Sequence, residues 1–131
     1  MIVVDSSVWI GLLRGADSGP VHRLRGFAET EDDQILVGDL VLLEVLQGAR
    51  DEAHASRIER NLRRYPVVPM LSDSLGVLAA RNYWRLRGRG ITVRKTVDMI
   101  IGTYCLEGGH ILLHDDRDFD PMAQHLGLQV T

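Results

Sequence analysis

Short apolar runs, each bounded by polar or turn-forming residues, constrain the fold of this chain more than any other feature. They occupy residues 2–4, 35–37, 67–68 and 111–113, and the segment Leu-Gln-Val at residues 128–130 is expected to form a fifth strand. Strands that are buried on both faces appear as such runs, whereas half-exposed strands alternate apolar and polar residues. Helical patterns separate the runs, and strands that alternate with helices form parallel sheets. The sequence therefore predicts an α/β fold, a three-layer α/β/α sandwich with a mainly parallel central sheet.

The helical stretches between the runs carry recognisable start and stop signals. We expect Asp39 to cap one helix, Ser72 or Asp73 a second, and Thr96 a third, because short polar side chains accept hydrogen bonds from free backbone amides. Asp120, with a proline behind it, predicts the start of a last short helix. The expected helices cover residues 8–13, 20–31, 40–49, 53–64, 73–87 and 97–106, followed by the short one after residue 120.

Length and composition indicate one soluble domain over residues 1–131, since 131 residues suffice for one substantial core. A carboxylate at residue 5 argues against a signal peptide, and no apolar run approaches the roughly 18 residues of a membrane span. The single cysteine, Cys105, excludes an internal disulfide and a cysteine-based zinc site, and we expect it to be buried. Trp9 and Trp84 are likewise expected in the core. We expect a cytoplasmic protein without membrane contact.

Carboxylates sit beside apolar runs at sites far apart in the sequence. Asp5 follows the first run, Asp116 follows the fourth, Glu44 interrupts a leucine-rich helix, and Asp98 lies in the first turn of a helix. Ligands of parallel sheets bind beyond the carboxyl ends of the strands. An ionised carboxylate in an apolar setting is costly unless a cation or a hydrogen-bond donor meets it. The pattern therefore indicates a shared cation, with Asp118 close by.

Each of these acids also has a simpler interpretation, which the sequence leaves open. Asp5 could be an N-cap only, Glu44 could belong to a solvent-facing helix surface, and Asp98 could merely complement the helix dipole. Residues 115–118 could form an acidic loop. These interpretations do not explain why the acids fall together at strand ends and helix starts.

The net charge of −3 conceals a strong asymmetry. Residues 50–95 carry a net charge of +7, whereas the segments before and after them each carry −5. A basic segment of this kind is either a solvated helical face or a surface for a polyanion. The candidates for polyanion binding are Arg57, Arg60, Arg64, Arg81, Arg85, Arg89 and Arg94.

The ordered set of motifs resembles a PIN-domain ribonuclease and, more narrowly, a VapC-type toxin of a bacterial toxin–antitoxin pair. The resemblance covers essentially the whole chain and implies a single PIN domain over residues 1–131. Its motifs are VVDSSVWI at residues 3–10, Glu44 in its leucine-rich helix, TVDMII at residues 96–101 and LLHDDRDFD at residues 112–120.

The resemblance implies that Asp5, Glu44, Asp98 and Asp116 are the catalytic acids. It matches Asp118 to an acid often found beside the fourth, and Ser6 or Ser7 to a small hydroxyl residue after the first. The metal ligands are expected among the following acids: Asp5, Asp98, Asp116 and Asp118. The sequence departs from the family at His114, where a small hydroxyl residue is common.

A cluster of oxygen ligands without cysteine or histidine favours Mg²⁺ or Mn²⁺. One ion, or two ions about 3.5–4 Å apart, can activate water for in-line attack on the phosphorus of an RNA phosphodiester. We expect Asp5 and Asp98 to be direct ligands, and Glu44 and Asp116 to hold a second ion or to orient water. Ser7 is a candidate hydrogen-bond donor to the acids that bind the metal, without binding the metal itself. The resemblance also implies an RNA substrate held by the basic segment, a cognate VapB-type antitoxin and a homodimer.

Other functions compete with this hypothesis. A phosphatase of the haloacid dehalogenase class needs Asp-x-Asp after its first strand, but Ser6 and Ser7 follow Asp5 here. A receiver domain needs a lysine at a strand end, whereas the only lysine, Lys95, precedes a helix. From a different class, a catalytically inert PIN-like module that binds RNA or protein remains the alternative.

Overall fold

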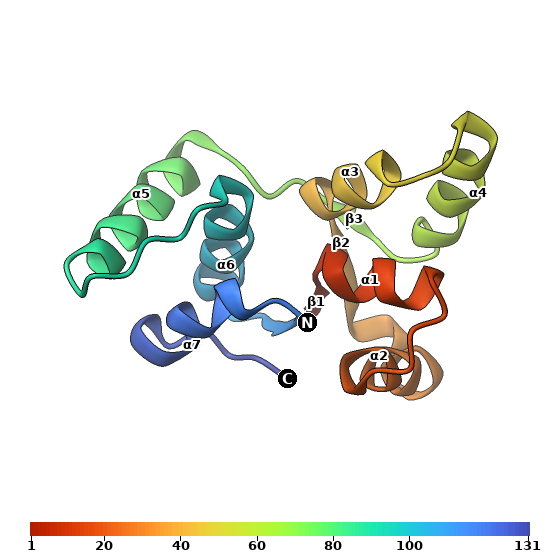
Figure 1. Ribbon diagram of the computed structural model, residues 1–131, viewed down its shortest axis with the longest axis horizontal. Coiled ribbons are helices and arrows are strands. Elements are labelled where there is room, and N and C mark those ends of the chain that lie inside the picture. The colour runs from red at the N-terminus through yellow and green to blue at the C-terminus, as the bar shows by residue number, and fades with distance from the viewer.

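The computed structural model describes residues 1–131 and contains a four-stranded, all-parallel sheet (Figure 1). The strands are β1 (Ile2–Val4), β2 (Ile35–Gly38), β3 (Val67–Val68) and β4 (Ile111–Leu113). Their order is β3-β2-β1-β4. Ile2 pairs with Ile35 on one side and with Ile111 on the other, so β1 lies inside the sheet. Four of the five predicted strands are therefore confirmed.

The fifth predicted strand, at residues 128–130, is wrong. The chain there forms only an isolated parallel bridge between Leu112 and Val130. The Gln129 carbonyl accepts a 2.9 Å hydrogen bond from Leu112 N, and Thr131 N donates one of 3.1 Å to the Leu112 carbonyl. Val130 is 42% exposed, so burial of its side chain adds little to hold a longer strand in place.

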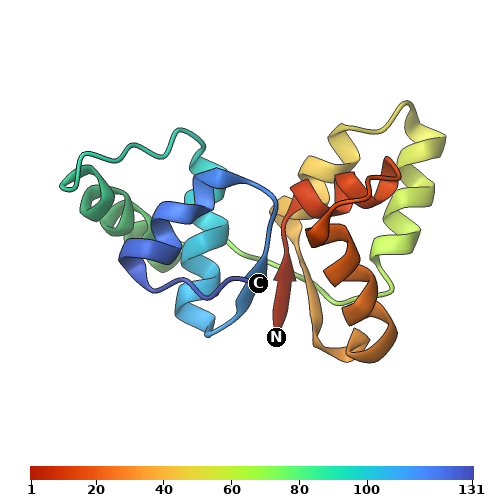
Figure 2. The same cartoon turned by 60° about the horizontal axis from the view of Figure 1, so that its bottom comes forward.

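Helices cover both faces of the sheet, which confirms the three-layer sandwich. Figure 2 shows α1 to α4 on one side of β1 and α5 to α7 on the other. The helices are α1 (Ser6–Leu13), α2 (Gly19–Thr30), α3 (Asp39–Gln47), α4 (Glu52–Leu62), α5 (Asp73–Arg87), α6 (Thr96–Gly108) and α7 (Asp120–Leu126). Two single 3₁₀ turns, η1 (Asp32–Gln34) and η2 (Arg117–Phe119), complete the fold. No helix combines the length and the apolar character that crossing a bilayer requires.

One hydrophobic core of 27 buried residues joins the layers. All three residues of β1 and all four of β2 are buried, as continuous apolar runs predict. Cys105 is free and buried, as expected, and Trp9 is 5% exposed. The expectation for Trp84 is wrong, because this side chain is 67% exposed on α5.

Three of the predicted N-caps lie one residue too late. Asp39, Thr96 and Asp120 are the first residues of their helices, and the capping positions belong to Gly38, Lys95 and Phe119. At Asp39 the reason is a competing contact. Its Oδ1 accepts hydrogen bonds from Leu40 N at 2.8 Å and from Met70 N at 3.1 Å. The carboxylate thus ties the start of α3 to the segment after β3. Ser72 is the N-cap of α5, one of the two residues expected there.

The chain order creates a switch point between β1 and β4. From β1 the chain proceeds outward to β2 and β3, and then returns to the opposite side of β1 for β4. The two connections consequently leave the carboxyl ends of β1 and β4 in opposite directions, and ligands of parallel sheets bind at such an edge. Asp5 N donates a 2.9 Å hydrogen bond to the Leu113 carbonyl and holds the two strand ends together.

Candidate metal centre

Asp5 stands directly after β1 at this edge of the sheet and is 3% exposed. Its Oδ2 accepts hydrogen bonds from Ser7 N at 3.1 Å and from Ser7 Oγ at 2.6 Å. The N-cap interpretation is therefore correct for this oxygen, but it does not account for the other. Oδ1 is buried without a hydrogen-bond partner, and burial raises the pKa of the Asp5 carboxyl. A buried oxygen without a donor is costly, so this atom favours a cation.

Asp98 is the second buried acid, in the first turn of α6 and 3% exposed. Its Oδ2 also lacks a hydrogen-bond partner. Burial, followed by the negative charges of Asp5 and Asp116, raises the pKa of Asp98 to about 7. The helix dipole alone would stabilise the carboxylate and lower this pKa. Asp98 is thus destabilised in its ionised form unless positive charge is supplied.

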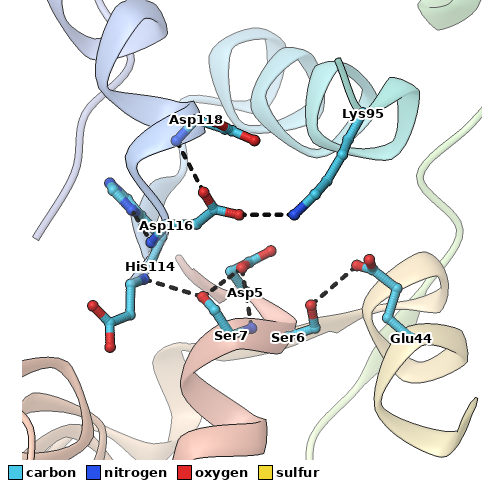
Figure 3. A network of polar contacts seen from close by, with 9 residues as sticks. Asp5, Ser6, Ser7, Glu44, Lys95, His114, Asp116 and Asp118 are labelled. Atoms are coloured by element: carbon cyan, nitrogen blue, oxygen red, sulfur yellow. Dashed lines mark hydrogen bonds and ion pairs between the residues drawn. The ribbon is translucent and has the colours of Figure 1, made fainter. Parts of the chain in front are cut away.

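Asp116 and Asp118 belong to the turn after β4. Asp118 N donates a 2.9 Å hydrogen bond to Asp116 Oδ1, which caps the 3₁₀ turn η2 (Figure 3). Asp98, Asp116 and Asp118 each offer one carboxylate oxygen, and these oxygens lie within 4.8 Å of one another. We call these three residues the carboxylate triad. They bring together α6 and the loop after β4, which are separated in the sequence by a strand.

Asp5 lies outside the carboxylate triad, although the sequence predicts it as a direct ligand together with Asp98. Its charge nevertheless acts on Asp98, where it is the largest electrostatic contribution to the raised pKa. Asp116 acts on Asp5 in the same direction. Asp5 therefore borders the triad, and a direct bond from Asp5 to a metal stays a prediction.

Glu44 projects from the middle of α3 toward the same region (Figure 3). Its Oε1 accepts a 3.1 Å hydrogen bond from Ser6 Oγ, 38 residues away in the sequence. Burial raises the pKa of Glu44, whereas the hydrogen bond from Ser6 lowers it. Because Glu44 is half-buried and bonded to the buried Ser6, the interpretation as a purely solvent-facing residue is wrong.

Lys95 is a residue that the sequence prediction missed. It occupies the N-cap position of α6, and its Nζ lies 3.3 Å from Asp116 Oδ2. This contact, together with the charges of Asp98 and Asp118, raises the pKa of the lysine. One signal was available in the sequence: the chain's only lysine stands three residues before Asp98.

The residues between β4 and η2 form hydrogen bonds that hold the turn carrying Asp116 and Asp118 in place. His114 Nδ1 accepts a 3.2 Å hydrogen bond from Asp116 N, and its ring lies 5.1 Å from the ring of Phe119. His114 thus stabilises the turn that carries Asp116. Asp115 is exposed, but its backbone N donates a 3.1 Å hydrogen bond to Ser7 Oγ. The Ser7 hydroxyl consequently connects the loops that follow β1 and β4.

The predicted basic residues do not form one patch. All seven arginines are exposed, but they divide into two groups. Figure 1 shows α4 and α5 at opposite ends of the long axis of the molecule. The α4 group consists of Arg57 and Arg60 on that helix and Arg64 just after it. The α5 group consists of Arg81 and Arg85 on the helix and Arg89 and Arg94 in the loop after it, where Arg94 directly precedes Lys95.

The residues of this centre fit a hard divalent cation. The triad offers only carboxylate oxygens, the ligands that Mg²⁺ and Mn²⁺ prefer, and contains no cysteine or histidine. Two buried carboxylate oxygens, Asp5 Oδ1 and Asp98 Oδ2, lack a donor. A divalent cation would offset both their desolvation and the mutual repulsion of the acids.

Known proteins share both the sequence pattern and the architecture. The chain is 29% identical to "Ribonuclease VapC11" from Mycobacterium tuberculosis over 132 aligned positions, which cover 100% of this chain and 98% of the relative. Among solved structures, VapBC2 from Rickettsia felis bound to a promoter DNA fragment has a TM-score of 0.77 at 15% identity, covering 100% of this chain and 98% of that chain. VapBC-1 from nontypeable Haemophilus influenzae has a TM-score of 0.74 at 18% identity, covering 100% and 97%.

The model of the family described as "PIN domain" matches residues 2–124, which span the sheet and every acid of the candidate centre. This chain belongs to the PIN domain family.

Proposed function

We propose that this protein is a metal-dependent endoribonuclease that acts as the toxin of a toxin–antitoxin pair, with residues 1–131 forming one PIN domain. The observation that carries the proposal is the convergence of Asp98, Asp116 and Asp118 within 4.8 Å beside the buried Asp5. Two buried acids, Asp5 and Asp98, each keep one carboxylate oxygen without a partner, which opposes folding, so function is the better explanation for the cluster. The name of the full-length relative, a ribonuclease, supports the same reaction.

The carboxylate triad is the proposed binding site for Mg²⁺ or Mn²⁺, with Asp5 as a further ligand. When bound, such an ion lowers the pKa of water and offsets the negative charge that develops on the oxygens of a phosphodiester during in-line displacement. The raised pKa of Asp98 means that this carboxyl is partly protonated near neutral pH without a cation. Binding of the ion would therefore release a proton from Asp98.

Two hydroxyl residues position the remaining acids. Ser7 donates to Asp5 through both its backbone N and its Oγ, which leaves Asp5 Oδ1 directed to another partner. Ser6 holds one oxygen of Glu44, so the other oxygen is free to orient a water molecule. Because burial raises the pKa of Glu44, its carboxylate is a better proton acceptor than an exposed glutamate. We assign Glu44 the role of orienting the attacking water.

RNA is the proposed substrate, and its backbone would extend from the acid centre over at least one of the two arginine groups. Exposed arginines hold phosphates with little sequence preference and release counterions when they do so. Binding to two separated groups requires an RNA long enough to reach both ends of the molecule. A folded RNA meets this requirement more readily than a short single strand.

The proposed partners are a VapB-type antitoxin and a second copy of this chain. The titles of the two similar structures name VapBC assemblies, and an antitoxin side chain with a positive charge would neutralise the acid centre. For the homodimer, α5 offers exposed apolar side chains at Val77 (55%) and Trp84 (67%), seven residues apart on one face. Light scattering on wild type and Trp84→Ser tests this, because the variant should shift the protein toward monomer.

The decisive experiment is cleavage of a labelled tRNA and rRNA pool by purified protein with Mg²⁺, with Mn²⁺ and with EDTA. Asp98→Asn should abolish the discrete fragments, whereas Asp115→Asn, an exposed neighbour of Asp116, should retain them. Circular dichroism should show that both variants are folded, so that a loss of cleavage is not a loss of structure. An intact RNA pool under every metal condition, with no metal binding by calorimetry, would instead favour the inert binding module.

A further inference from the structure

Lys95 is the only basic side chain in an ion pair with an acid of the candidate centre. The other two pairs, His22 with Asp17 and Arg63 with Glu59, lie on exposed parts of the surface elsewhere. The backbone of Lys95 is fixed at the N-cap of α6, three residues before Asp98. Its ammonium group is consequently tethered at the edge of the carboxylate triad.

The ion pair between Lys95 and Asp116 is easily exchanged. The Nζ–Oδ2 distance is 3.3 Å, and the lysine side chain is 59% exposed. Exposed ion pairs contribute at most about 1 kcal/mol, because water solvates both partners well. The flexible stem of a lysine also lets its ammonium change partners without movement of the backbone. Fixing the triad does not require this contact, since Asp116 is already held by Asp118 N and His114.

A cation in the triad would change the balance of charge around Lys95. It would compete for the Asp116 carboxylate and repel the ammonium group, so Lys95 would turn outward. A phosphodiester that approaches the centre meets several carboxylates and needs positive charge on its exposed side. Helices α4 and α5 lie at opposite ends of the molecule, and Arg94 forms no ion pair with the acids although it directly precedes Lys95. Lys95 is the candidate cation that contacts an acid of the centre.

We propose that Lys95 is a further catalytic residue, whose ammonium leaves Asp116 when the divalent cation binds and then binds the scissile phosphate of the RNA. This inference rests on the proposed nuclease function. In this proposal Lys95 binds two partners one after the other. The first is the Asp116 carboxylate in the metal-free protein, and the second is a phosphate in the complex with substrate. A lysine that only balances the charge of the acids would keep the first partner and have no second one.

The first experiment follows Lys95 without cleavage. Because the chain has one lysine, ¹³C-lysine labelling gives a single side-chain signal to observe by NMR. Titration with Mg²⁺ should move this signal toward its position in Asp116→Asn, which lacks the carboxylate partner. In parallel, Lys95→Gln should bind Mn²⁺ about two- to fivefold more tightly by calorimetry, since one exposed ion pair no longer competes. Unchanged Mn²⁺ affinity overturns the exchange of partners.

The second experiment measures cleavage at saturating Mn²⁺. Lys95→Gln should reduce kcat/KM about 10- to 100-fold, the loss expected for one charge-assisted hydrogen bond. Lys95→Arg should restore most of the activity. The matched control is Arg25→Gln, which removes an exposed cation from α2. If Lys95→Gln cleaves RNA as fast as Arg25→Gln, Lys95 is only a counter-ion and the proposal fails.

Failure of this proposal is distinguishable from failure of the proposed function. If only the role of Lys95 is wrong, wild type cleaves RNA and Lys95→Gln cleaves it equally well. If the proposed nuclease function is wrong, the wild-type protein itself does not cleave RNA. Because the side chain is largely exposed, Lys95→Gln should unfold at the wild-type temperature, which circular dichroism verifies.

Discussion

The Ser7 hydroxyl donates a 2.6 Å hydrogen bond to Asp5 Oδ2, the shortest link between a small polar residue and an acid of the centre. The same hydroxyl oxygen accepts a 3.1 Å hydrogen bond from the backbone N of Asp115. One side chain thus connects the acid after β1 to the loop after β4, across the switch point of the sheet. The relative position of Asp5 and Asp116 therefore depends on Ser7.

Replacement of this hydroxyl should affect both stability and activity. We expect Ser7→Ala to lower the free energy of unfolding by about 1–2 kcal/mol, because a buried carboxylate and an amide lose a partner. The pKa of Asp5 should rise further, since the hydrogen bonds from Ser7 lower it. Urea denaturation measures the first effect, and the pH dependence of cleavage the second. Ser56→Ala, at an exposed position on α4, is the control, and an equal loss there would contradict this role.

Divalent metal should stabilise the folded protein. A ligand present at 100 times its Kd contributes about 2.7 kcal/mol, so Mn²⁺ or Mg²⁺ at that excess should raise Tm by several degrees. The increase should disappear in Asp98→Asn and persist in Asp115→Asn, which preserves the carboxylate triad. Differential scanning calorimetry with and without EDTA measures it. A similar increase in all three proteins would indicate nonspecific binding.

Asp98 should make the stability of the metal-free protein depend on pH. Its pKa is raised from 3.8 to about 7, so the folded state retains a proton that the unfolded chain loses. The associated stability is fully present below pH 3.8 and is lost as the pH rises through 7. Asp98→Asn should therefore gain stability relative to wild type as the pH rises from 4 to 7. The gain can reach about 4 kcal/mol, at about 1.4 kcal/mol for each pKa unit.

Chemical denaturation in EDTA at several pH values measures this difference. Above pH 7 the difference in unfolding free energy between wild type and Asp98→Asn should stay constant. The reason is that Asp98 of the wild type is then ionised in both the folded and the unfolded state. With saturating Mn²⁺, wild type should instead be more stable than Asp98→Asn, since only wild type retains the full triad. Parallel pH profiles for both proteins in EDTA would contradict the assignment of the raised pKa to Asp98.

The two arginine groups should contribute separately to RNA binding. Replacing Arg57 and Arg60 on α4, or Arg81 and Arg85 on α5, with Gln should weaken binding and reduce the salt dependence. The slope of log K against log salt should fall by about 1 for each lost phosphate contact. Fluorescence anisotropy at several salt concentrations measures this slope. Arg25→Gln serves as the control, and identical slopes in all variants would exclude both groups.

Much of the fold was predictable because the two inner strands, β1 and β2, are fully buried. Continuous apolar runs are typical of such strands, and the same pattern also located β3 and β4, although β3 is only half-buried and Ile111 in β4 is exposed. The strand expected at residues 128–130 failed because the polar Gln129 interrupts the segment, which forms only one bridge to Leu112 and leaves Gln129 and Val130 exposed. The caps at Asp39 and Thr96 were misplaced because capping depends on backbone dihedral angles and on tertiary partners, as Met70 N shows.

The centre was predictable to the extent that its geometry follows from strand order. Asp5 and Asp116 come after adjacent parallel strands, so they had to meet at one edge. The sequence could not indicate that Asp118 would join Asp98 and Asp116 more closely than Asp5 does, because this depends on the turn η2. Lys95 was missed since its contact with Asp116 spans 21 residues and arises only when α6 packs beside the turn.

The strand order β3-β2-β1-β4 also determines when the acid centre can exist during protein synthesis. A ribosome produces Asp5, Glu44 and Asp98 first, but β4 and its turn supply Asp116 and Asp118 only afterwards. A nascent chain that ends before residue 111 therefore lacks strand β4 and two of the three carboxylates of the triad. The complete triad can form only after the C-terminal part of the chain has been synthesised.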